Sequence, residues 1–217
     1  LDVPVEEAGA QAVPLAGFGV ISGECGVLDE GVWGSSEPFF FVNHLDFGTD
    51  AYDAGDYDNL TPGAQKIFDD GNAGGSSIVS EMFAYEVLMR CELAALLKTE
   101  TEIAYRTQAG SITDLLVTID DRQVGVSVTR AVHWPFDDPY TVEIATESLT
   151  KKLEGVLASS ANVAPVDAWE RQILHILAYA APHAESLHQA WSQLPAELRA
   201  DTVLMVTVTD GDDSPVY

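Results

Sequence analysis

The chain has 217 residues, with 35 acidic side chains against 10 basic ones and a formal net charge of −25 at pH 7. Hydrophobic residues make up 47 % of it, which suits a folded domain with a core and excludes a disordered acidic tail. The sequence has no apolar run long enough for a membrane span and no basic stripe for non-specific binding of nucleic acid. We therefore expect a soluble protein, either secreted or cytoplasmic. Because it begins at Leu1 without an apolar leader, we expect a matured or trimmed chain.

Residues 1–75 are the first predicted unit. They hold 14 acidic residues and one basic residue, Lys66, amid many glycines and turn-forming residues. We expect an irregular acidic extension that packs on the rest of the chain, with one short strand at Pro38 to Val42. Cys25 of this extension and Cys91 further along can form one disulfide, or both can remain buried thiols.

Residues 76–217 are the second predicted unit, an α/β core. After Gly74-Gly75, Ser76 or Ser77 can cap a long helix that runs to about Lys98. Alternating or continuous apolar patterns then predict three strands, with a hairpin loop of four residues between the last two. The strands are residues 101–106, 112–119 and 124–132, and the loop is residues 120–123.

The pattern continues with a second helix after Pro139, for which Thr141 is a plausible cap. A strand, a helix and a last strand follow at residues 173–179, 182–194 and 202–209. The order is α-β-β-β-α-β-α-β, which predicts a mixed central sheet flanked by helices.

The first helix carries two kinds of carboxylate. Glu86 and Arg90 are four residues apart and predict an ion pair on the solvent side. Glu81 shares a narrow stripe with Tyr85 and Glu92 between apolar neighbours. A carboxylate in an apolar setting needs a partner or a metal ion, unless the stripe is a partly exposed helix edge.

Asp114 raises the same question, because apolar residues follow it on both faces of its strand. It can pair with Arg130, accept hydrogen bonds at a strand edge, or serve a functional site. On the next strand, Ser127 and Thr129 point to the face opposite the valines. A hairpin that brings them beside Asp114 would form a small polar patch on the sheet.

A helix with Glu81, a hairpin with Asp114 on its first arm, and a following helix and strand resemble the α-β-β-β-α-β core of the PD-(D/E)XK nuclease superfamily, over about residues 76–180. The resemblance implies that Glu81 and Asp114 hold Mg²⁺ or Mn²⁺ and that a lysine helps to activate water. At the position of the superfamily's (Asp/Glu)-x-Lys triplet this chain has Ser127-Val128-Thr129. One acidic ligand and the lysine are therefore missing.

Neighbouring elements offer replacements for the missing groups. The candidates are Glu143, Glu147, Lys151 and Lys152 on the second helix and Lys98 at the end of the first. Arg130, His133 and Trp134 are candidate substrate contacts. The segment His133-Trp134-Pro135-Phe136 can stack a base or a sugar, or it covers the end of the sheet.

The leading functional hypothesis is metal-dependent hydrolysis of nucleic acid. Glu81 and Asp114 would bind the metal, Ser127 and Thr129 would hold water or phosphate, and Lys151 or Lys152 would replace the lost lysine. The alternative is a non-catalytic or toxin-like module on the same scaffold that recognises a protein or carbohydrate partner. A third hypothesis is a Ca²⁺-stabilised module, with solvated acidic loops as its alternative. Its loops contain Asp46, Asp50, Asp53, Asp56 and Asp58, and Asp210-Gly211-Asp212-Asp213.

Overall fold

Eight strands form one mixed sheet in the computed structural model, which describes residues 13–15, 19–49, 51–72, 77–107, 109–136 and 138–217. Their spatial order is β1-β2-β3-β8-β7-β6-β5-β4. β6, β7, β8 and β3 run parallel, whereas the strands at both edges are antiparallel to their neighbours. The strands are β1 (Val13–Leu15), β2 (Gly19–Gly23), β3 (Phe39–Asp46), β4 (Ala95–Thr99), β5 (Leu115–Ile119), β6 (Arg122–Ala131), β7 (Arg171–Ala178) and β8 (Val203–Asp210).

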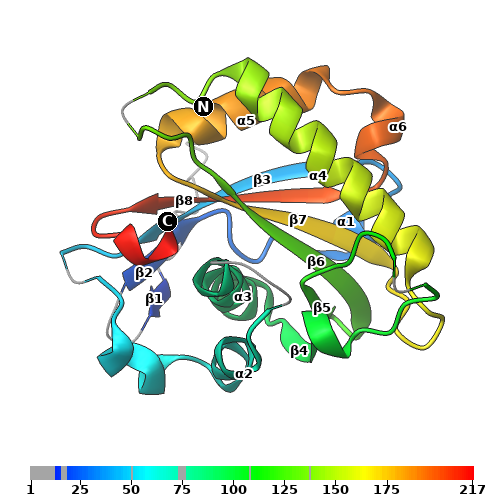
Figure 1. Ribbon diagram of the computed structural model, residues 1–217, viewed down its shortest axis with the longest axis horizontal. Coiled ribbons are helices and arrows are strands. Elements are labelled where there is room, and N and C mark those ends of the chain that lie inside the picture. Colours follow the sequence, from blue (N-terminus) through cyan, green and yellow to red (C-terminus); the bar gives the residue numbers. More distant parts are fainter. Residues whose placement is uncertain (1–12, 16–18, 50, 73–76, 108, 137) are drawn as a thin grey trace, which may run out of the picture.

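Helices cover both faces of the sheet (Figure 1). α3 (Ile78–Glu92) packs on one face with α2 (Pro62–Asp70) beside it, and α4 (Val142–Asn162), α5 (Ala181–Gln193) and α6 (Ala196–Arg199) cover the other. β7 and β8 are buried on both faces, which explains their nearly continuous apolar sequences. The remaining short elements are α1 (Glu30–Trp33), η1 (Ala54–Asn59), η2 (Glu100–Glu102) and η3 (Ser214–Val216).

The predicted fold class is confirmed. From α3 onward, the main elements follow one another as α3, β4, β5, β6, α4, β7, α5 and β8, which is the expected α-β-β-β-α-β-α-β order. Thr141 caps α4 as predicted, because its side chain accepts a hydrogen bond from the Ile144 N–H. In the described part of the chain, no helix combines the length and the apolar character that a bilayer crossing requires.

The first long helix ends earlier than predicted. It stops at Glu92, because Leu93 adopts a left-handed conformation (φ 54°) and turns the chain into β4. The strand predicted at residues 101–106 is wrong: the strand is Ala95–Thr99, and η2 follows it. At the start of the helix, Gly74-Gly75 and Ser76 lie outside the described residues. Ser77 occupies the cap position without bonding the helix backbone through its side chain.

The hairpin between β5 and β6 is tighter than the predicted four-residue loop. Only Asp120 and Asp121 connect the strands, and both have positive φ values, 50° and 62°. Such two-residue turns match the right-handed twist of paired strands, and aspartate tolerates this conformation better than most residues. Asp114 lies just before β5 rather than inside it, with its N–H donating to the Val126 carbonyl (3.1 Å).

The residues before α3 contribute to the same sheet. The strand predicted at Pro38 to Val42 is present and extends to Asp46 as β3, which pairs with β8 along its whole length. β2 and β1 continue the sheet outward from β3. The N-terminal stretch therefore supplies three strands in addition to its turn-rich segments.

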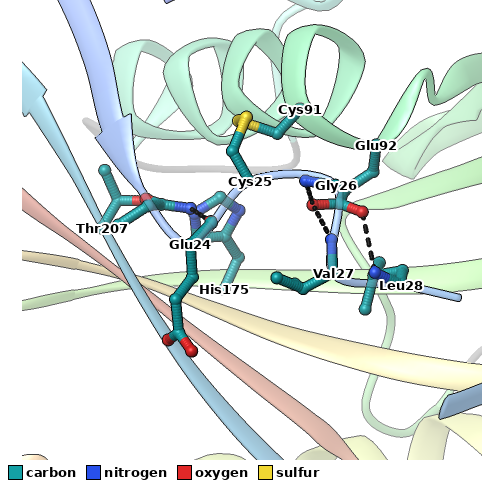
Figure 2. Close-up of a disulfide and its surroundings, with 10 residues drawn as sticks. Glu24, Cys25, Gly26, Val27, Leu28, Cys91, Glu92, His175 and Thr207 are labelled. Atoms are coloured by element: carbon teal, nitrogen blue, oxygen red, sulfur yellow. Dashed lines mark hydrogen bonds between the residues drawn. A yellow bond between two sulfur atoms is a disulfide. The ribbon is translucent and has the colours of Figure 1, made fainter. Parts of the chain in front are cut away.

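A disulfide joins Cys25 to Cys91 (Figure 2), which confirms the predicted disulfide over the alternative of two buried thiols. The next residue of α3, Glu92, turns its carboxylate toward the segment that follows Cys25 and stabilises it by charge-assisted hydrogen bonds. The end of α3 is therefore attached to a distant loop by one covalent link and one buried carboxylate. The donors to Glu92 are three consecutive backbone N–H groups: Gly26 (2.8 Å), Val27 (3.2 Å) and Leu28 (3.0 Å).

Candidate metal centre

Three carboxylates converge between α3 and the β5–β6 hairpin. Glu81 comes from the first turn of α3, Glu100 from the start of η2, and Asp114 from the residue before β5. One oxygen of each lies within 4.8 Å of the others, and among the described residues this is the only such group of three. Octahedral Mg²⁺ with bonds of about 2.1 Å holds opposite ligand oxygens about 4.2 Å apart. Small side-chain shifts would therefore bring the three oxygens into one coordination sphere. The donor set fits a hard divalent cation.

Glu81 is held in place by two neutral donors. Its side chain is 3 % exposed, and Oε1 accepts hydrogen bonds from Asn72 Nδ2 and Ser77 Oγ, both at 2.8 Å. Asn72 Nδ2 also lies 2.8 Å from Ser77 Oγ, so the three side chains form a closed cluster. Burial raises the pKa of Glu81, with a further contribution from the negative charge of Glu100. Burial and Glu100 therefore disfavour the charged form of Glu81, and a bound cation would favour it.

Asp114 is held in place by a hydrogen bond from β6. Its Oδ2 accepts a hydrogen bond from the backbone N–H of Val128 (2.6 Å). Burial and the neighbouring charge of Glu81 raise the pKa of Asp114 to about 7. A carboxylate with so high a pKa is typical of sites in which like charges are gathered for a cation or for catalysis.

A cavity of about 270 Å³ opens beside Asp114. Lys151 and Lys152 of α4 reach it from one side, and Ser127 of β6 lies on the other. Lys152 is half-buried, and its positive charge favours the ionised forms of both Glu81 and Asp114. A lysine therefore lies near Asp114 in the folded chain, although Ser127-Val128-Thr129 of β6 contains none. The other lining residues are Ser111, Ile112, Val128, Gly155 and Val156.

Several predicted site residues lie elsewhere. Thr129 is on the same face of β6 as Ser127 but does not line this cavity. Arg130 donates to the backbone carbonyls of Val216 (3.2 Å) and Tyr217 (3.4 Å), so the predicted pair with Asp114 is not formed. His133 follows the end of β6, and Trp134 beside it packs against Phe136 at a separate cavity.

Two other predicted roles for charged residues are corrected. Lys98 forms a salt bridge with Asp167 (2.7 Å), which engages its ammonium away from the three carboxylates. Glu86 does pair with Arg90 (2.7 Å), but Glu86 is completely buried rather than solvent-exposed. The reason is that α2 covers this face of α3, and Thr61 donates to Glu86 through both its N–H (2.6 Å) and its hydroxyl (2.8 Å).

The aspartate loops use their carboxylates as turn acceptors. Asp46 accepts from the Gly48 N–H (2.7 Å), and Asp53 caps η1 together with Asp56. Asp50 lies outside the described residues. In the last loop, Asp210, Asp212 and Asp213 bond His44, Ser214 and Thr209, respectively. Except for the contact between His44 and Asp210, these bonds are local, and they favour the acidic-loop alternative over a calcium site.

Glu100 is a site residue that the sequence pattern did not indicate. The pattern places it in the link between a long helix and a strand at residues 101–106, whereas the strand is Ala95–Thr99. The available signal was weak, because Ala95–Thr99 has three apolar residues followed by two polar ones and does not alternate as an edge strand usually does. A strand there places Glu100 directly after its end. Glu100 is the third acidic group of the cluster with Glu81 and Asp114, and Ser127-Val128-Thr129 contributes none.

The raised pKa of Asp114 predicts how stability depends on pH when no metal is bound. The folded state holds the proton up to about pH 7, whereas the unfolded chain releases it near 3.8. This contribution to stability is therefore complete below about pH 4 and is lost as the pH rises to about 7. Urea unfolding in chelator should show the wild-type protein losing roughly 2 kcal/mol between pH 5 and pH 7.5 relative to Asp114→Asn. Equal pH profiles for the two proteins would contradict the raised pKa.

Comparisons with known proteins give one similar sequence. No family model matches the chain, and no solved structure matches it. Over 153 residues the chain is 40 % identical to the "AAC-rich mRNA clone AAC4 protein" of Dictyostelium discoideum. The aligned region covers 68 % of this chain and 22 % of that protein, so the chain spans about a fifth of the length of this curated relative.

Proposed function

We propose that this protein is a metal-dependent phosphodiesterase that acts on nucleic acid and has a PD-(D/E)XK-like core. The observation that carries the proposal is the convergence of Glu81, Glu100 and Asp114 beside a cavity that Lys152 enters. The order α3-β4-β5-β6-α4-β7 agrees with the core that the resemblance implies. An acidic group from η2 and a lysine from α4 would replace the two groups that β6 lacks.

Each residue has a distinct role in this proposal. Glu81, Glu100 and Asp114 would hold Mg²⁺ or Mn²⁺, which supplies Lewis-acid polarisation of a phosphate oxygen. Asn72 and Ser77 keep Glu81 oriented, and the Val128 N–H keeps Asp114 oriented. Lys152 would donate to a phosphate oxygen or position the attacking water. Ser127 presents its hydroxyl to the same cavity and is itself held by Gln172 Nε2 (3.1 Å).

The net charge sets a condition on substrate binding. Residues 76–217 hold 21 acidic and 9 basic side chains, so they remain negative by 12 charges. Such a field opposes the approach of a polyanion. The bound cation and the two lysines of α4 must therefore supply the local attraction, and we expect activity to need divalent metal for binding as well as for the reaction.

The direct test is a cleavage assay on four substrates: single-stranded and double-stranded DNA and RNA. We expect hydrolysis of at least one substrate with Mg²⁺ or Mn²⁺ and none in chelator. If all four remain intact across these metals, hydrolysis is excluded. The non-catalytic binding module with a protein or carbohydrate partner then becomes the better account of this scaffold.

Lys152 offers a sharper test of the site. Lys152→Met should lower kcat about a hundredfold, because a positioned general acid or electrostatic donor contributes about that much. Lys151→Met is the matched comparison, since Lys151 is the more exposed neighbour on the same helix turn. It should weaken the attraction for the substrate and so raise KM, but it should change kcat less than about threefold. Equal losses of kcat in the two variants would indicate a general effect of positive charge instead of a specific role for Lys152.

A further inference from the structure

A second and larger cavity, of about 690 Å³, lies at the carboxyl ends of β6 and β7. It is bordered by the first turns of α4 and α5 and by the loops that lead into them. Crevices beyond the carboxyl ends of parallel strands are frequent ligand sites in α/β sheets, and the volume is in the usual range for small molecules. None of the three carboxylates of the metal centre lines this cavity.

The charged side chains that line this cavity are acidic. Asp138, Glu143 and Glu185 line it together with the amide of Gln189, and the described lining contains no lysine or arginine. All four side chains are exposed to solvent. The three carboxylates repel phosphates and other anions, and the oxygens of all four side chains can accept hydrogen bonds from hydroxyl groups.

Three aromatic side chains, Trp134, Phe136 and Tyr179, lie at or beside the same cavity. Trp134 is 75 % exposed and meets Phe136 edge to face, with ring centroids 5.1 Å apart. Phe136 lines the cavity and stacks on Tyr179 (4.9 Å), which lines it too. An exposed indole next to exposed carboxylates presents an apolar surface and hydrogen-bond acceptors to one ligand.

His183 adds a buried polar group without a partner. The side chain lines the cavity, is 7 % exposed and stacks on Tyr140 with centroids 4.8 Å apart. Its Nδ1 is buried and has no hydrogen-bond partner in the described part of the chain. Buried polar atoms are nearly always bonded to protein, water or ligand. A small movement of the imidazole that opens this nitrogen to the cavity would let it bond a ligand there.

We propose that this cavity binds a neutral carbohydrate. The apolar face of a sugar ring would lie on one of the two aromatic rings, Trp134 or Phe136. Its hydroxyls would reach the carboxylates and, once the imidazole moves to open it, His183 Nδ1. A nucleotide or a sugar phosphate lacks the cationic partner that its charge requires. A quaternary ammonium would suit the carboxylates, but it can neither donate a hydrogen bond to the imidazole nor accept one from it. The proposal is independent of the metal centre.

The test uses a panel of methyl glycosides of glucose, galactose, mannose and N-acetylglucosamine, titrated into the whole protein by NMR and calorimetry. We expect at least one to bind with a Kd below about 20 mM. Trp134→Ala should weaken that binding at least about tenfold, and Glu185→Gln should weaken it severalfold. Val166→Ala is the matched control, because Val166 is 73 % exposed and lies outside the cavity, and it should leave the affinity unchanged.

Three outcomes would overturn the proposal. The first is that no glycoside of the panel binds. The second is that binding persists unchanged in both Trp134→Ala and Glu185→Gln, while thermal melts show that the variants are folded. The third is that glucose 6-phosphate or tetramethylammonium binds more tightly than every neutral glycoside, since an anion or a cation would then be the preferred ligand.

Discussion

Replacing Asp114 with asparagine should lower metal-dependent turnover at least about a thousandfold, because one of three anionic ligands becomes neutral. The fold should survive the change. Asparagine has nearly the same shape, and its carbonyl oxygen can still accept the hydrogen bond that the Val128 N–H gives to Asp114. The measurement is the cleavage rate at saturating Mn²⁺, with the melting temperature of the metal-free variant measured in parallel. In chelator at neutral pH, the variant should be at least as stable as the wild-type protein, because a repulsive charge is gone.

Asp121→Asn is the matched control for this substitution. Asp121 is an exposed turn residue with positive φ, a conformation that asparagine adopts readily, and the substitution removes the same charge from the chain. Its turnover should stay within about twofold of the wild-type value. If Asp114→Asn retained most of the activity, Asp114 would not be a ligand of the reacting centre, and the proposed mechanism would fail.

Breaking the disulfide between Cys25 and Cys91 should lower the free energy of unfolding by about 4 kcal/mol. The estimate follows from the loop-closure entropy of cysteines 66 positions apart in the sequence. Folding of the reduced protein should persist at lower stability, because Glu92 still accepts three backbone hydrogen bonds from the segment after Cys25. Urea unfolding with and without reductant measures the difference.

The control for reduction is the double variant Cys25→Ser with Cys91→Ser. It should unfold at the midpoint of the reduced wild-type protein, and reductant should not shift it further. A wild-type midpoint that reductant leaves unchanged, with free thiols confirmed by labelling, would show that the link adds nothing to stability. The loop would then be held by Glu92 and by packing alone.

Features that depend on short stretches of sequence were predictable. β7 and β8 were recognised from continuous apolar runs, which arise because both faces of each strand are buried. The cap at Thr141 was recognised because a hydroxyl residue precedes a helical apolar pattern. From these elements the layered α/β fold and its chain order followed.

Features that depend on unusual backbone conformations or on distant partners were not predictable from the sequence. Leu93 ends α3 in a left-handed conformation that a leucine does not signal, and the error displaced both β4 and Glu100. Glu86 was expected to face solvent. Its burial depends on contact with α2, whose cap residue Thr61 lies 25 residues earlier in the chain, and local spacing does not indicate that contact. A pair between Arg130 and Asp114 was one of the open alternatives, but the acceptors of Arg130 lie more than 80 residues along the chain from it. Local patterns carry no information about such contacts.

The central claim is that Glu81, Glu100 and Asp114 together bind one divalent cation. Calorimetric titration of the metal-free protein with Mn²⁺ at pH 7 tests it most directly. We predict a single site that releases protons on binding, since the pKa of Asp114 is about 7, and an affinity at least about tenfold lower in Glu100→Gln. Glu102→Gln, altered two residues further along η2, should bind like the wild-type protein. Mn²⁺ affinity unchanged by Glu100→Gln, or absent from the wild-type protein, would contradict the account.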